Sequence, residues 1–134
     1  MEYCDINAAY ISMRFPKLKK RIDALKRIWQ SPDLSPYTLF YDVIFQDICE
    51  LFAQNANTEI KEYFEFVEDL LLSRVDKPRS SRTGDDIENL IQTGFLEYFW
   101  DTPQLYALAQ QYMGTLTRKI FENIGAYLNQ PDIY

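Results

Sequence analysis

Proline divides this chain into helices, because it recurs at positions where a helix can begin. Ser35-Pro36 and Thr102-Pro103 each combine a side chain that can cap a helix with a proline suited to the first turn, and Pro16 is placed to open a third segment. Between these signals the apolar residues recur every three or four positions, which is the period of an amphipathic helix. The pattern therefore predicts an all-α protein.

Five main helices are expected, with a short additional helix near the N-terminus. The apolar pattern and the turn residues predict helices at about 16–29, 36–54, 58–73, 85–100 and 103–129, and a sixth at about 6–13. The connections are short, which favours antiparallel neighbours. The chain has 134 residues, enough for one domain. We expect a single compact antiparallel bundle of about five to six helices over residues 1–134, with a core at about 15–129 and a basic loop at 76–85.

The amino-acid composition excludes several kinds of active site. The chain has no histidine, so it has no Ser-His-Asp triad, no Cys-His pair and no histidine-ligated zinc site. Four scattered glycines do not form a loop that cradles phosphate. Glu97, which lies among apolar residues, is the best candidate for a general acid or base, but a position at the edge of the bundle explains it better. We expect no catalytic residue, no metal and no cofactor.

The location of the protein is inferred from the apolar runs, the first residues and the cysteines. The apolar runs are far shorter than the roughly 20 residues of a membrane span, and the first residues have no signal-peptide pattern. Two cysteines form no disulfide framework, and Cys49 lies among apolar residues, as expected of a buried free thiol. The sequence thus predicts a cytoplasmic protein without a membrane partner.

Charge is segregated along the chain. Residues 14–30 contain seven basic side chains against one acid, a local net charge of +6. Residues 33–72 contain nine acids against one lysine, a local net charge of −8, and residues 85–101 contain five acids and no base. The formal net charge of the whole chain is −6. Most of the surface would therefore repel phosphate, and nucleic acid is not the expected partner.

Two interpretations of the acidic segments stay open. The basic segment can offset the acidic helices inside the bundle, or the acids can form a docking face for a basic protein. Carboxylates three and four residues apart repel one another slightly, and a positive partner would relieve that repulsion. Neighbouring tyrosines would add aromatic anchors. The predicted docking face consists of Tyr41, Asp42, Asp47, Glu50, Glu59, Glu62, Tyr63, Glu65 and Asp69.

Four short motifs resemble a known group of proteins. They are Phe15-Pro16-x-Leu18-Lys19, Leu39-Phe40-Tyr41-Asp42, Phe64-x-x-Val67-Glu68-x-Leu70-Leu71 and Ile91-x-Thr93-Gly94-Phe95-Leu96-Glu97. The resemblance covers roughly residues 15–129, without the basic loop, and is to a family of small all-helical bacterial proteins. Some of these are similar to immunity proteins of polymorphic toxin and contact-dependent growth inhibition systems. The resemblance implies a cytoplasmic protein that binds a cognate toxin domain, such as a nuclease with a basic cleft, and neutralises it. It carries over no catalytic residue.

Two other functions stay open on the sequence alone. A regulatory or adaptor domain would bind a partner helix in an apolar groove, and its binding would depend weakly on salt. An enzyme would need a bound metal or a pocket that raises the pKa of Glu97. Because the chain has no recognisable arrangement of nucleophile and base, binding of a partner protein is the expected function.

Overall fold

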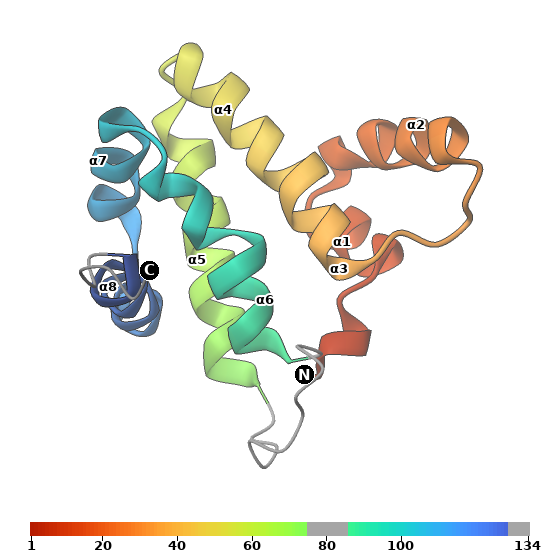
Figure 1. Cartoon of the computed structure of the whole chain (residues 1–134). Coiled ribbons are helices and arrows are strands. Elements are labelled where there is room, and N and C mark those ends of the chain that lie inside the picture. Colours follow the sequence, from red (N-terminus) through yellow and green to blue (C-terminus); the bar gives the residue numbers. More distant parts are fainter. Residues whose placement is uncertain (75–85, 129–134) are drawn as a thin grey trace.

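The computed structural model describes residues 1–74 and 86–128, and these residues form an all-α fold without strands (Figure 1). The first half begins with η1 (Tyr3–Asp5), α1 (Ala8–Arg14), η2 (Pro16–Leu18) and α2 (Lys19–Trp29). A continuous helical segment follows, made of α3 (Pro36–Thr38), the π-helical η3 (Leu39–Phe45) and α4 (Gln46–Ala53). The second half contains α5 (Asn57–Ser73), α6 (Ile87–Gly94), η4 (Leu96–Trp100), α7 (Pro103–Tyr112) and α8 (Thr115–Leu128). The predicted all-α class is confirmed.

Two of the predicted helix starts are confirmed by their capping bonds. The Ser35 hydroxyl accepts a hydrogen bond from the backbone N–H of Thr38, at 3.2 Å, at the start of α3. The Thr102 hydroxyl accepts one from the backbone N–H of Leu105, at 3.1 Å, at the start of α7. Each cap is followed by proline. These bonds satisfy backbone donors that the first turn leaves free, and so they determine where each helix begins.

Helix α5 lies at the centre of the fold and contacts α4, α6, α7 and α8 (Figure 1). Residues two positions apart on a helix point in directions about 200° apart, so Phe64 and Phe66 face opposite sides. The ring of Phe64 packs against Phe95 and Phe99, whereas the ring of Phe66 packs against Phe15. The central helix is therefore buried on more than one face, through Ile60, Tyr63, Phe64, Phe66, Val67, Leu70 and Leu71.

The single helix predicted at 103–129 is wrong, because the chain forms two helices there. Met113 has an extended backbone (φ −65°, ψ 137°), which ends α7 at Tyr112. The carboxylate of Glu68, from α5, then caps the first turn of α8. It accepts hydrogen bonds from the backbone N–H groups of Leu116 (3.0 Å) and Thr117 (2.9 Å), and from the hydroxyl of Thr117 (2.8 Å).

Gly114 allows this close approach of Glu68. A Cβ atom at position 114 would lie 2.5 Å from the carboxyl carbon of Glu68, far inside van der Waals contact. The carboxylate also lies at the positive end of the α8 dipole, where negative charge is stabilised. A glutamate of the central helix thus determines where the last helix begins, and the apolar period of the sequence does not reveal this.

The helix predicted at 85–100 is also divided. Helix α6 ends at Gly94, and Phe95 leaves the helical conformation (φ −140°, ψ −65°) before η4 begins. The break places the ring of Phe95 against Phe40, Phe64 and Phe99, with ring centroids 5.1 to 5.7 Å apart. Burial of this aromatic group therefore overrides the continuation of the helix. If the joined α3, η3 and α4 are taken as one, the described residues form seven α-helices, rather than the predicted five to six.

The core extends further toward the N-terminus than predicted. Ile6 and Ile11 are almost fully buried, so the core begins before the expected position 15. Ile124 is the last buried large apolar residue described, and the predicted basic loop at 76–85 lies outside the described residues. Cys49 is a free thiol but is half-buried rather than buried. None of the described helices is long and apolar enough to cross a membrane.

Glu68→Ala is expected to destabilise the protein. The change removes three hydrogen bonds from the start of α8, so the free energy of unfolding should fall by about 2–4 kcal/mol in urea denaturation. Glu65→Ala is the matched control, because Glu65 is exposed and pairs with Lys61 one turn earlier on the same helix. Its loss should be below about 0.5 kcal/mol. Equal losses in the two variants would contradict the capping role of Glu68.

Candidate protein-binding site

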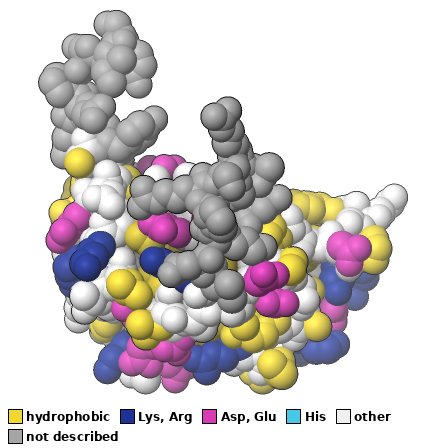
Figure 2. Space-filling view, turned by 90° about the horizontal axis from the view of Figure 1, so that it is seen from below, with side chains coloured by type: hydrophobic (Ala, Val, Ile, Leu, Met, Phe, Trp, Pro, Cys, Tyr) yellow, Lys and Arg dark blue, Asp and Glu magenta, His cyan; other side chains and the backbone are white. Residues whose placement is uncertain are grey.

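The charges that are segregated along the sequence are mixed on the folded surface. Figure 2 shows Lys and Arg side chains alternating with Asp and Glu side chains on one face, rather than one continuous area of a single sign. The mixing arises because the basic segment in η2 and α2 is joined by ion pairs to acids of α4 and α5. The local net charges of the sequence are therefore partly cancelled by the fold.

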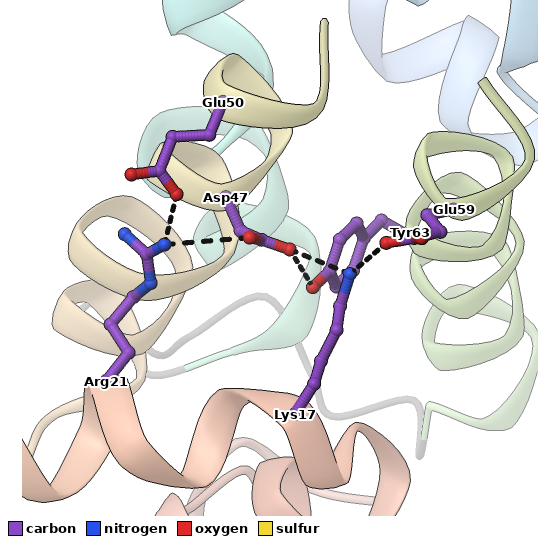
Figure 3. Close-up of polar contacts among 6 residues, drawn as sticks. All are labelled: Lys17, Arg21, Asp47, Glu50, Glu59 and Tyr63. Carbon is purple, nitrogen blue, oxygen red and sulfur yellow. Dashed lines mark hydrogen bonds and ion pairs between the residues drawn. The ribbon is translucent and has the colours of Figure 1, made fainter. Parts of the chain in front are cut away.

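Asp47 is the centre of this contact (Figure 3). Its side chain is 13% exposed, and its Oδ2 accepts a hydrogen bond from the Tyr63 hydroxyl at 2.6 Å. The same oxygen lies 3.1 Å from Nζ of Lys17, and Oδ1 lies 3.6 Å from Nη2 of Arg21. Burial of a carboxylate is costly unless the group is paired and hydrogen-bonded, and these three partners meet that need.

Two exposed glutamates extend the contact outward. Lys17 also pairs with Glu59 of α5, and Arg21 with Glu50 of α4. Burial lowers the pKa of Lys17, but its bonds with Glu59 and Asp47 outweigh this effect, so the pKa of the lysine is raised. The result is a connected group that ties η2 and α2 to the two acidic helices. We call it the Asp47 network: Lys17, Arg21, Asp47, Glu50, Glu59 and Tyr63.

The predicted role of Tyr63 as a surface anchor is wrong. Its side chain is 1% exposed, and its ring centroid lies 4.7 Å from that of Phe15. Burial and the hydrogen bond to Asp47 raise the pKa of its hydroxyl well above the usual range. A side chain with almost no exposed surface cannot anchor a partner on an intact face. Tyr63 instead holds Asp47 in place from the core side.

The remaining predicted acids of α5 lie in different surroundings. Asp69 lies 3.5 Å from Arg14 of α1, and both side chains are exposed. Glu65 lies 3.8 Å from Lys61. Glu62 is exposed and forms no ion pair with the described residues. Ion pairs with the basic segment thus account for four of the nine residues of the predicted docking face: Asp47, Glu50, Glu59 and Asp69.

Tyr41 and Asp42 lie beside residues outside the predicted face. Both belong to η3, and π-helical turns occur frequently at functional sites. The ring centroid of Tyr41 lies 4.3 Å from that of Tyr98 in η4. Electrostatic interactions also couple Tyr98 to Glu97, Asp42 and Asp101. We call these five residues the tyrosine–acid patch.

Two carboxylates of the patch, Asp42 and Glu97, are partly buried without an ion pair to any described residue. All members of the patch except the exposed Asp101 are half-buried. Burial raises the pKa of Asp42 and also the pKa of Glu97. Within the described residues, no lysine or arginine forms an ion pair with the three carboxylates of the patch. Carboxylates that are partly desolvated and lack a positive neighbour favour a cationic ligand.

Only part of this patch could be recognised in the sequence. The apolar surroundings of Glu97 mark it as an acid–base candidate, and its raised pKa has the direction that such a role needs. No sequence signal places Tyr98 beside Tyr41, because that contact depends on the break at Phe95 that turns the chain into η4. In residues 1–74 and 86–128, no group of Cys, Asp and Glu is arranged to hold a metal ion.

The chain matches the model of one protein family over most of its length. The family described as a domain of unknown function (DUF7674) matches residues 8–129. The chain belongs to this family. No curated protein and no solved structure matches it. The matched range contains the whole tyrosine–acid patch and the whole Asp47 network. The description of the family names no activity.

Asp47→Asn is expected to weaken the contact between the basic and acidic segments. The change keeps the shape of the side chain but removes the charge that Lys17 and Arg21 share. The free energy of unfolding should fall by about 1–3 kcal/mol in urea at low salt. Glu50→Gln is the control, because Glu50 is 57% exposed and its pairing is screened by solvent, so its loss should be below about 1 kcal/mol. An equal loss for Glu50→Gln would contradict the central position of Asp47.

Glu97→Gln is expected to stabilise the protein at neutral pH. Because burial raises the pKa of Glu97, the folded state disfavours the charged form, and glutamine removes that penalty. Protonation of Glu97 relieves the same penalty. The resulting stabilisation of the folded state is fully present below the pKa that Glu97 has in the unfolded state. It is lost as pH rises through the higher pKa that Glu97 has in the folded state. Thermal denaturation should therefore show a higher melting temperature for the variant near neutral pH and no difference in acid.

Glu122→Gln is the control for this comparison, because Glu122 is exposed on α8 and its replacement removes the same charge. An equal rise in melting temperature for Glu122→Gln would show that net charge, rather than the burial of Glu97, is the cause.

Proposed function

We propose that this protein is an immunity protein, which binds a basic cognate toxin domain through the tyrosine–acid patch and neutralises it. The observation that carries the proposal is the patch itself. Two tyrosine rings lie in contact beside three carboxylates, none of which has a basic partner among the described residues. The resemblance to immunity proteins supports the class of partner, and the patch supports the chemistry of the contact.

The patch combines an aromatic centre with charged neighbours, which suits a protein interface. Tyr41 and Tyr98 offer large, rigid surfaces that carry much of the binding energy in many complexes. The carboxylates attract a positive partner over a distance and raise the rate of association. A lysine or arginine from the partner would also favour the ionised forms of Asp42 and Glu97, whose pKa values burial now raises. Binding is therefore expected to release protons and to weaken in acid.

The Asp47 network has a structural role in this proposal. A partner that used Asp47, Glu50 or Glu59 would first have to displace Lys17 or Arg21. Glu62 and Glu65 on α5 remain exposed, and a partner can reach these two acids of the predicted docking face without displacing Lys17 or Arg21.

A nuclease toxin fits the charge of the patch. Nucleases bind phosphate through basic surfaces, and an acidic inhibitor can occupy such a surface in place of nucleic acid. The proposal includes a cytoplasmic location and no cofactor, membrane or nucleic acid as ligand of this chain. The alternative is an adaptor domain that binds an apolar helix, in which case binding would respond little to salt or to the carboxylates.

The test measures binding to the basic toxin domain encoded beside this protein. The variant Asp42→Asn/Glu97→Gln/Asp101→Asn should associate about tenfold more slowly than the wild type at low salt, because three steering charges are lost. Stopped-flow fluorescence gives the rate. Protection of cells that express the toxin gives the functional readout, and it should weaken in parallel.

Glu62→Gln/Glu65→Gln is the comparison, since it removes exposed charges of α5 and leaves the patch intact. Its association rate should stay close to that of the wild type. If this variant slows association and the patch variant does not, the partner binds at α5. If neither variant nor added salt changes binding, the adaptor alternative is favoured.

A further inference from the structure

The C-terminal end of α2 presents an unusual combination of exposed side chains. Ile28 is 72% exposed and Trp29 is 49% exposed, and they are neighbours at the last two positions of the helix. Lys26 and Arg27 precede them directly. The exposed Lys20 lies near the start of α2, seven residues or about two turns before Arg27, and therefore on the same side of the helix. Neither apolar side chain belongs to the described core or to the residues packed against it. We call these five residues the basic α2 end.

The charges of this end are not used by the fold. Lys17 and Arg21 belong to the Asp47 network, and Lys19 pairs with Asp23 one turn later. Lys20, Lys26 and Arg27, by contrast, form no ion pair with any described residue. The seven basic side chains of the segment are therefore of two kinds. Four pair with acids, namely Arg14, Lys17, Lys19 and Arg21, and three keep their positive charge at the surface.

The charge of the whole chain indicates what kind of partner fits. A nucleic acid or an anionic membrane would approach a protein with a net charge of −6, so the rest of the surface would repel it. A small acidic surface meets the three cations without spreading over the acidic segments around them. A second copy carries the same net charge of −6, so the local match of opposite charges has to outweigh the overall repulsion, which salt screens beyond about 10 Å at 0.1 M. The tyrosine–acid patch of this same chain is such a surface, with three carboxylates and two aromatic rings. No ion pair joins the basic α2 end to the patch within one described molecule.

We propose that the basic α2 end of one molecule docks on the tyrosine–acid patch of a second copy. Three cations then meet three carboxylates, and Trp29 and Ile28 reach the rings of Tyr41 and Tyr98. Indole against phenol is a favourable aromatic contact, and Arg27 can stack on a ring as a cation. The contact is heterologous, because the two surfaces differ. It is salt-sensitive and depends on protein concentration.

This inference rests on the proposed function, because it uses the same patch. It adds a way in which binding of the toxin domain is regulated. Self-association covers the patch, so a toxin domain has to compete with the α2 end of another copy. At high concentration the free protein is stored in the associated form, and the toxin releases it. A variant without the basic α2 end keeps the patch and is therefore expected to bind toxin at least as well as the wild type.

The experiment is a complementation test by sedimentation velocity at low salt. Lys20→Glu/Arg27→Glu reverses the α2 end, and Glu97→Lys/Asp101→Lys reverses the patch. Each variant alone should self-associate at least about tenfold more weakly than the wild type. An equal mixture of the two should associate again. The reversed, negative α2 end of the first variant meets the reversed, positive patch of the second, and the intact α2 end of the second meets the intact patch of the first.

Lys61→Glu/Lys119→Glu is the matched control, because it changes net charge as much as the first variant at exposed positions outside both surfaces. It should associate like the wild type. Circular dichroism of every variant establishes that a loss of association is not a loss of folding. A wild type that stays monomeric, or a mixture of folded variants that does not regain association, overturns the inference.

The two proposals fail in different ways. In one case the wild type self-associates and the mixture regains association, but Asp42→Asn/Glu97→Gln/Asp101→Asn protects cells as well as the wild type. The proposed function then fails and this inference stands. If the wild type is monomeric and Lys20→Glu/Arg27→Glu binds toxin normally, the inference fails and the proposed function stands.

Discussion

Helix α5 has to be buried on several faces at once, and much of the fold depends on this requirement. Seven of its 17 residues are buried, and four other helices supply the surfaces that cover them. A helix in this position can carry polar side chains on its covered faces only if each has a partner. Tyr63 meets this condition by donating its hydroxyl hydrogen to Asp47, and Glu68 meets it by capping α8. The first contact joins α5 to α4 and, through Asp47, to Lys17 of the N-terminal segment, and the second joins α5 to α8.

The charges of the protein follow from the same arrangement. The N-terminal segment packs where Lys17 and Arg21 reach Asp47, so the strongest local charges of the sequence partly cancel at that contact. Other charges of the described residues stay unpaired. The tyrosine–acid patch carries negative charge on η3 and η4, and the end of α2 carries positive charge beside exposed apolar groups. The function proposed for the protein uses the charges that the fold leaves unpaired.

Much of the helical pattern could be predicted from residues that act locally. Ser35 and Thr102 cap helices through bonds that span three residues, so their effect is visible in the sequence. The ends of α6 and α7 could not be predicted in this way. Phe95 leaves the helix because its side chain is buried against the distant rings of Phe40 and Phe64 as well as against Phe99. Helix α8 begins where it does because Glu68, 48 positions before Leu116, reaches its first turn.

The sequence by itself determined the all-α class, the capped helix starts, the segregation of charge and the lack of histidine chemistry. These properties depend on neighbouring residues or on composition, and no tertiary contact changes them. Only the tertiary structure decided which acids are compensated and which are available. Asp47 and Asp42 are indistinguishable as acids on one predicted helix. Yet one faces the cations of the basic segment, and the other lies beside Tyr98 without a positive neighbour among the described residues. That difference depends on which helices pack together, because an ion pair requires its two charges to lie within a few ångströms whatever their separation along the chain.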